Sequence, residues 1–125
     1  MKNFNKDTKI TLAGVSQNPE KYGHKIFKDL LKNNYDVVGI NPKGGIILDQ
    51  KIYSSLNDIE RESQLLIIVL PPLIGIDVVK NAHEIGINNI WLQPGAQNNK
   101  IVEYAKLNGI NLIYNQCFMV DQGIW

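Results

Sequence analysis

Five short apolar runs, separated by segments with helical periodicity, dominate the pattern of the chain. The runs are residues 9–15 (KITLAGV), 36–41 (DVVGIN), 65–70 (LLIIVL), 89–92 (NIWL) and 111–114 (NLIY). Unbroken apolar runs of this length are typical of strands that are buried on both faces of a parallel sheet. The pattern therefore predicts five parallel strands.

Apolar residues recur at helical spacing between these runs. One helix is expected from Tyr22 to about residue 33, a second ends at Gly86, and a third ends at Gly109. The segment 44–62 is more polar, and we expect a loop there with a short helix around residues 56–59.

Alternating strands and helices predict an α/β fold, a doubly wound parallel sheet of five strands in the order 3-2-1-4-5 with helices on both faces. A length of 125 residues, 44% of them hydrophobic, suits a single domain over residues 1–125. In such sheets ligands bind beyond the carboxyl ends of the strands, where the winding reverses. The loops that follow the strands should therefore converge on one crevice.

Charge and cysteine content exclude several classes of partner. The net charge is +1, with 13 basic and 12 acidic residues, so no global attraction to nucleic acid or to an anionic membrane is expected. The apolar stretch 65–79 is too short to span a bilayer. The single cysteine, Cys117, fits a reducing compartment, and the polar first residues lack a signal peptide. We expect a cytoplasmic protein.

The loop after the first strand is a candidate phosphate-binding loop. It lacks the G-x-G-x-x-G spacing of dinucleotide-binding proteins but keeps Gly14 directly after the strand. Backbone N–H groups at the helix start, together with Ser16 and Lys21, could hold a pyrophosphate. An ordinary polar turn between strand and helix is the alternative.

A lysine follows the second strand, in the sequence Asn41, Pro42, Lys43. Proteins that bind NAD usually place an acidic residue at this point to hold the ribose hydroxyls. A cation there suits a phosphorylated ribose, as in NADP (2′-phosphate) or coenzyme A (3′-phosphate). The alternative is a solvated surface lysine.

Three further corners border the expected crevice. Pro71 and Pro72 stiffen the connection after the third strand, and they also offer a flat apolar wall to an adenine or a pantetheine arm. Gln93 could bind amide groups after the fourth strand. Cys117 follows the fifth strand, where a lone cysteine is more often a small buried apolar residue than a reactive thiol.

We find no catalytic constellation and no metal-ligand spacing in the sequence. His24 and His83 have no carboxylate or cysteine at a triad-like or metal-binding distance along the chain, and both are interpreted as surface or cap residues. The acidic residues are scattered and form no pair suited to acid/base work. The sequence therefore predicts a binding crevice without catalysis.

Five segments, taken in order, carry a resemblance to a known family: AGVSQNPEKYG, GINPKGG, IVLPP, WLQPGAQN and YNQC. The chain resembles the stand-alone CoA-binding domain proteins, whose Rossmann-like fold is that of the N-terminal CoA-binding domain of the succinyl-CoA synthetase alpha subunit. The resemblance implies that CoA lies across the strand ends. It does not carry over ligase activity, because the phosphorylated histidine and partner domains of the synthetase lie outside the matching region.

The implied contacts follow the anatomy of coenzyme A. They are, for the phosphates, Gly14, Val15, Ser16, Gln17, Asn18 and Lys21; for the phosphorylated ribose, Asn41, Pro42 and Lys43; for the adenine or its linker, Leu70, Pro71 and Pro72; and for the pantetheine end, Gln93, Pro94 and Gly95. Cys117 is added as a candidate neighbour of the CoA thiol. The stand-alone relatives usually have proline after this cysteine, whereas Phe118 follows it here.

The leading hypothesis is a small cytoplasmic protein that binds CoA or an acyl-CoA as a sensor or carrier, without catalysis of its own. An NADP-binding oxidoreductase or redox sensor is the main alternative. A protein that forms a mixed disulfide between Cys117 and CoA, and an interaction subunit that has lost its ligand, are two others. Ile124 and Trp125 could pack onto the chain's own core or onto a second copy in a homodimer.

Overall fold

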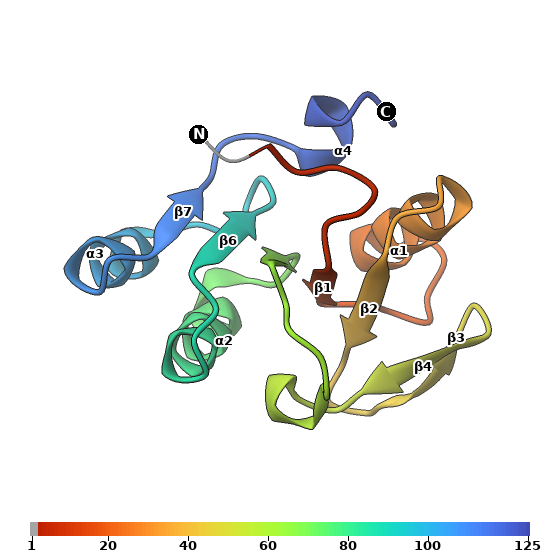
Figure 1. Ribbon diagram of the computed structural model, residues 1–125, viewed down its shortest axis with the longest axis horizontal. Helices are drawn as coiled ribbons and strands as arrows, with labels where there is room; N and C mark the ends of the chain where they lie inside the picture. Colours follow the sequence, from red (N-terminus) through yellow and green to blue (C-terminus); the bar gives the residue numbers. More distant parts are fainter. Residues whose placement is uncertain (1–2) are drawn as a thin grey trace.

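The computed structural model describes residues 3–125, which form one twisted sheet with helices on both faces (Figure 1). The strands are β1 (Ile10–Ala13), β2 (Val37–Ile40), β3 (Gly45–Ile47), β4 (Gln50–Tyr53), β5 (Leu65–Ile68), β6 (Asn89–Leu92) and β7 (Asn111–Ile113). The helices are α1 (Tyr22–Lys32), α2 (Pro72–Glu84), α3 (Asn99–Leu107) and α4 (Phe118–Asp121), with a short 3-10 helix, η1 (Leu56–Asp58).

The sheet has seven strands in the order β3-β4-β2-β1-β5-β6-β7. The five expected strands are present as β1, β2, β5, β6 and β7, but the predicted five-stranded sheet of order 3-2-1-4-5 is wrong. The expected third strand, β5, pairs directly with β1. The place beside β2 is taken by β4, which is parallel to it, and β3 is antiparallel to β4 at the edge.

The hairpin β3–β4 replaces part of the loop predicted over residues 44–62. Each of its strands has one buried apolar residue, Ile47 and Ile52, whereas Ile46 is 68% exposed. Its two-residue turn has positive φ angles at Leu48 and Asp49, a geometry in which glycine or asparagine is usual. The hairpin therefore lacks both the apolar run and the turn residues by which sequence patterns indicate strands.

The parallel part of the sheet has the strand order of the dinucleotide-binding α/β fold. When β4 is counted as the third parallel strand, the order of the six parallel strands is 3-2-1-4-5-6. The winding reverses between β1 and β5. This is the switch point at which ligands bind in such sheets, beyond the carboxyl ends of the strands.

Alternate residues of the central strands point to opposite faces of the sheet and belong to two separate hydrophobic cores. Ile10, Leu12 and Leu65 point to the face covered by α1 and α4, and Ala13 and Leu66 point to the face covered by α2 and α3. Figure 1 shows these two helix pairs on opposite sides of the sheet. All four residues of β1 and of β5 are buried, because helices cover both faces of these strands.

The last residues of the chain pack onto α1. Ile124 contacts the core on the α1 side of the sheet. The indole of Trp125 lies 5.9 Å from the ring of Tyr22 between centroids and donates a hydrogen bond to Asp29 Oδ2 at 2.7 Å. Ile124 and Trp125 thus make contacts within the chain, which is one of the two arrangements that the sequence left open. Over residues 3–125, none of the helices has the length and apolar character needed to cross a bilayer.

Candidate functional site

A hollow of about 410 Å³ opens at the carboxyl ends of β1, β2, β4 and β5, with α2 along one side. We call it the crevice. This volume lies within the roughly 300–1,000 Å³ typical of small-molecule sites. The crevice is lined by Ala13, Gly14, Val15, Ser16, Ile40, Asn41, Pro42, Ser54, Ser55, Leu56, Leu70, Ile74, Asp77, Val78 and Asn81. It includes the switch point between β1 and β5, where the architecture of the sheet predicts a ligand.

Two glycines bring three backbone segments into contact at the crevice. Gly14 has a φ of +107°, and a Cβ added to it would lie 2.3 Å from the carbonyl oxygen of Val69, just after β5. A Cβ on Gly23, in the first turn of α1, would lie 1.8 Å from the carbonyl oxygen of Gly14. No larger residue fits either position without movement of the backbone. The start of α1, which no side chain caps, is therefore held directly against the loop that follows β1.

The loop after β1 is shaped by its own polar groups. The carbonyl oxygen of Ser16 accepts a hydrogen bond from Nδ1 of His24 at 2.8 Å, so this nitrogen carries a proton. The hydroxyl of Ser16 accepts from the backbone N–H of Asn18 at 3.1 Å, and Oδ1 of Asn18 accepts from the N–H of Glu20 at 3.0 Å. His24 is buried and fixes the loop through its bond to Ser16. The sequence suggested a surface or a cap residue, and the surface position is wrong.

Asn41 joins the loops that follow β1 and β2. Its Nδ2 donates to the carbonyl oxygen of Val15 at 2.6 Å, and its Oδ1 accepts from the backbone N–H of Lys43 at 2.8 Å. Pro42 lines the crevice, and the next residue, Lys43, is exposed. The amide of Asn41 thus fixes the backbone that carries the lysine.

The structure brings some of the sequence-predicted residues into the crevice and leaves others outside its wall. Those in the wall are Gly14, Val15, Ser16, Asn41, Pro42 and Leu70. Those outside it are Gln17, Asn18, Lys21, Lys43, Pro71, Pro72, Gln93, Pro94, Gly95 and Cys117. Most of the second group are exposed, as expected for loops that border a hollow, but Gln93 is not.

Gln93 is 4% exposed and holds the segment before α4. Its Oε1 accepts from the backbone N–H of Phe118 at 2.7 Å, and its Nε2 lies 3.4 Å from Sγ of Cys117. Both ends of the side-chain amide therefore have partners within the chain. Gln93 and Cys117, predicted separately from the sequence, lie together.

Sequence reasoning missed the crevice residues that come from the segment after β4, from η1 and from α2. They are Ser54, Ser55, Leu56, Ile74, Asp77, Val78 and Asn81. The four on α2 lie at positions i, i+3, i+4 and i+7 and so share one helical face, but this spacing does not distinguish a face that meets a ligand from one that packs in the core. Nδ2 of Asn81 donates to Oδ1 of Asn57 at 2.9 Å and ties α2 to η1.

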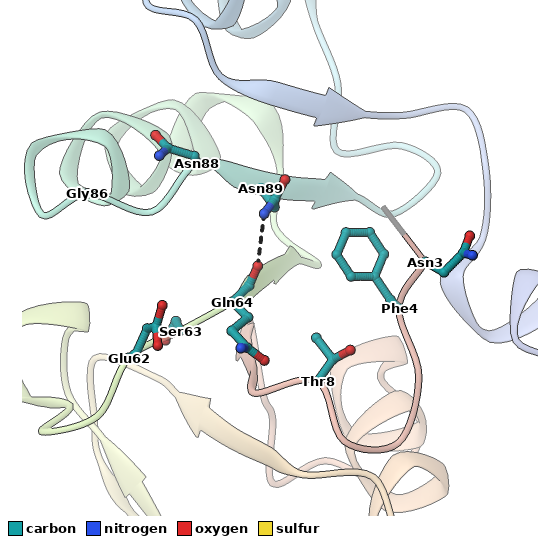
Figure 2. Close-up of a pocket in the computed structure, with 9 residues that line it drawn as sticks. All are labelled: Asn3, Phe4, Thr8, Glu62, Ser63, Gln64, Gly86, Asn88 and Asn89. Carbon is teal, nitrogen blue, oxygen red and sulfur yellow. Dashed lines mark hydrogen bonds between the residues drawn. The ribbon is translucent and has the colours of Figure 1, made fainter. Parts of the chain in front are cut away.

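A second hollow, of about 330 Å³, lies at the amino ends of the strands (Figure 2). Its residues are mostly polar, with Phe4 as the one large apolar side chain. Gln64 and Asn89 are used for internal contacts: Oε1 of Gln64 accepts from the N–H of Lys9 at 2.9 Å, and Nδ2 of Asn89 donates to the carbonyl oxygen of Gln64 at 3.2 Å. Because ligands of this fold bind at the other end of the sheet, the crevice is the candidate site.

The fold and the crevice define a Rossmann-like α/β protein with a ligand site at the carboxyl end of its sheet. The sequence matches the model of the CoA-binding domain family over residues 8–123. The chain belongs to this family.

Relatives with similar sequence or structure include both a large enzyme and small proteins. The ADP-forming acetate–CoA ligase of Methanocaldococcus jannaschii is 29% identical over 116 residues, which are 86% of this chain and 16% of the ligase. The chain thus spans about a sixth of that enzyme. YneT of Bacillus subtilis is 22% identical and is covered over 86% of its length, by 93% of this chain. A solved structure of a conserved hypothetical protein from Pyrococcus furiosus is 36% identical, with a TM-score of 0.89 over 92% of this chain and 99% of that one.

Proposed function

We propose that this protein binds coenzyme A, or an acyl-CoA, in the crevice and acts as a sensor or carrier with no chemistry of its own. Membership of the CoA-binding domain family supports the ligand. The structural observation that carries the proposal is the joining of two loops by Asn41. This residue fixes the glycine-containing loop after β1 and the backbone of Lys43 beside one apolar crevice.

The proposed pose divides the ligand among these features. The diphosphate lies at residues 14–18 and the uncapped start of α1, whose N–H groups and helix dipole favour an anion. Lys43 binds the 3′-phosphate of the ribose. The adenine enters the crevice, because its apolar walls suit a flat aromatic base. The pantetheine arm extends past Pro71 and Pro72 toward the corner formed by residues 93–95.

The chemistry of the crevice supports binding rather than catalysis. Among the described residues that line it, Asp77 is the one ionisable side chain, and the others are apolar, serine or asparagine residues. A catalytic site for acyl transfer or hydride transfer would need a positioned nucleophile, an acid/base pair or a second cofactor. Within the described wall, Asp77 alone supplies none of these.

Thermal unfolding with and without ligands tests the proposal. Coenzyme A should raise the melting temperature, with a stabilisation of about 2.7 kcal/mol at 100 times its Kd. Dephospho-CoA lacks the 3′-phosphate and should stabilise the protein less. Equal stabilisation by the two compounds would contradict the role of Lys43. A larger shift with NADPH than with CoA would favour the oxidoreductase alternative, and no shift with any nucleotide would leave the interaction-subunit alternative.

A further inference from the structure

One residue of the crevice wall carries a charge of the same sign as the phosphates of the proposed ligand. Asp77 lies on α2, in the crevice wall beside the apolar side chains Ile74 and Val78. Phosphates disfavour a nearby carboxylate, since like charges repel. In a site for a polyanionic ligand, this carboxylate must therefore face a part of the ligand that carries no phosphate.

The side chain of Asp77 is also free to accept hydrogen bonds. None of the side-chain hydrogen bonds or ion pairs found within residues 3–125 involves its carboxylate. Asn81, one turn further along α2, shows the contrast, since its amide is paired with Asn57. An ionised carboxylate is an acceptor only, so its natural partner in the ligand is an N–H donor.

The two charged residues near the crevice lie on different elements. Lys43 follows β2, whereas Asp77 is on α2, which follows β5, and β1 lies between β2 and β5 in the sheet. In the pose proposed above, the ribose phosphate is at Lys43 and the base lies in the crevice, which α2 borders. Adenine carries an exocyclic amine, N6, whereas guanine and hypoxanthine carry an oxygen at the equivalent position.

We propose that Asp77 selects the base, by accepting a hydrogen bond from N6 of adenine. This inference rests on the proposed function, because it needs a nucleotide in the crevice. The carboxylate would bind the amine of adenine and repel O6 of guanine, because the carboxylate and O6 are both hydrogen-bond acceptors. Asp77 is exposed, so the discrimination comes from the hydrogen bond gained with adenine and from the repulsion of O6 of guanine.

Titration calorimetry with two short probes tests the role of Asp77. The probes are adenosine 3′,5′-bisphosphate and guanosine 3′,5′-bisphosphate, which share both phosphates and differ in the base. The wild-type protein should prefer the adenosine compound by about 10-fold, as expected for one hydrogen bond to an exposed carboxylate. Asp77→Asn, whose amide can turn to donate to O6, should reduce this preference to a few-fold. Asp77→Ala should weaken binding of the adenosine probe and leave little preference.

Glu84→Gln is the matched control, since it removes a carboxylate from the same helix at an exposed position outside the crevice. It should keep the wild-type preference. If neither probe binds the wild-type protein and CoA does not raise its melting temperature, the proposed function fails and the inference with it. If CoA raises the melting temperature but neither probe binds, the inference is overturned while the proposed function stands. If the wild-type protein binds both probes equally, or if Asp77→Asn and Asp77→Ala keep the full preference, the inference is overturned while nucleotide binding stands. Melting temperatures of the three variants verify that each is folded.

Discussion

The two hollows at opposite ends of the sheet have similar volumes, about 410 Å³ for the crevice and 330 Å³ at the amino ends of the strands. Their walls differ. The crevice has many apolar side chains, from Ala13 on β1 to Val78 on α2, whereas the other hollow has mainly amides and hydroxyls around Phe4 (Figure 2). Water solvates a polar hollow well but an apolar one poorly. The chemistry of the wall, and not its size, therefore distinguishes the candidate site.

The largest expected difference between the two ends of the sheet is in the stability that is lost when a glycine is replaced by alanine. Gly14 in the crevice and Gly86 at the amino-end hollow both have positive φ angles, +107° and +88°. A Cβ on Gly14 meets the backbone of Val69, whereas nothing lies within 4 Å of a Cβ on Gly86. We expect Gly14→Ala to lower the free energy of unfolding by about 3 kcal/mol or more, and Gly86→Ala by about 1–2 kcal/mol. Urea denaturation of both variants measures this, and equal losses would contradict a tightly packed loop.

The next largest difference is expected in CoA affinity, between variants of two exposed lysines. Lys43→Ala should weaken CoA binding by about 1.5–3 kcal/mol, because it removes the proposed charge-assisted contact to the 3′-phosphate. Lys9→Ala makes the same change in net charge beside the amino-end hollow and should leave CoA affinity nearly unchanged. Titration calorimetry with CoA and with dephospho-CoA compares them. A loss for Lys43→Ala that is as large with dephospho-CoA as with CoA would show that the lysine acts elsewhere on the ligand.

A smaller effect is expected from replacing two asparagines that hold loops together. Asn41 bridges Val15 and Lys43 at the crevice, and Asn89 bridges Gln64 and Asn111 at the other end. Each replacement by alanine removes two hydrogen bonds and should lower the free energy of unfolding by about 1–3 kcal/mol. Only Asn41→Ala should also lower CoA affinity. A similar loss of affinity in Asn89→Ala would mean that general loosening, and not the crevice, limits binding.

The smallest expected effect is the pH dependence of Tyr35, just before the amino end of β2. Burial, and to a lesser extent the charge of Asp121, raise the pKa of Tyr35 above its ordinary value of 10.0, and its hydroxyl donates to Gln122 Oε1 at 2.8 Å. A folded-state pKa above the unfolded value stabilises the protein below the unfolded pKa, and this contribution is lost as the pH rises through the folded pKa.

Replacing Tyr35 by phenylalanine tests this contribution. Stability curves in urea between pH 8 and pH 11 should therefore fall less steeply for Tyr35→Phe than for the wild-type protein. CoA affinity at pH 8 should be the same in both, since Tyr35 is outside the crevice. If the stability of Tyr35→Phe falls as steeply as that of the wild-type protein, other groups cause the loss of stability at alkaline pH.

The parts of the fold that the sequence predicted are those in which burial alone decides the structure. β1 and β5 are recognisable because every one of their residues is buried. The hairpin β3–β4 was missed because it is an edge element, in which only one residue of each strand needs to be apolar. That omission also caused the wrong strand order, since β4 takes the place beside β2 that was assigned to β5.

The residues of the candidate site likewise divide into those that the sequence could predict and those that it could not. The loops after β1 and β2 could be predicted because parallel strands end at one edge of the sheet, whatever the packing. The residues from α2 could not, since Ile74 and Val78 in the crevice wall are of the same type as the core residue Val79. Periodicity alone does not say which apolar face of a helix meets a ligand. The buried role of His24 likewise depends on how closely α1 approaches the loop through Gly23.

The packing of Trp125 against Tyr22 supplies an intrinsic optical reporter. The other indole, Trp91, is 3% exposed, with its N–H bonded to the carbonyl oxygen of Gln116. Trp125 is 42% exposed and stacks on the first residue of α1, next to the loop proposed to hold the diphosphate. Fluorescence emission from the end of the chain should therefore respond when that loop is occupied, without a dye or an added label.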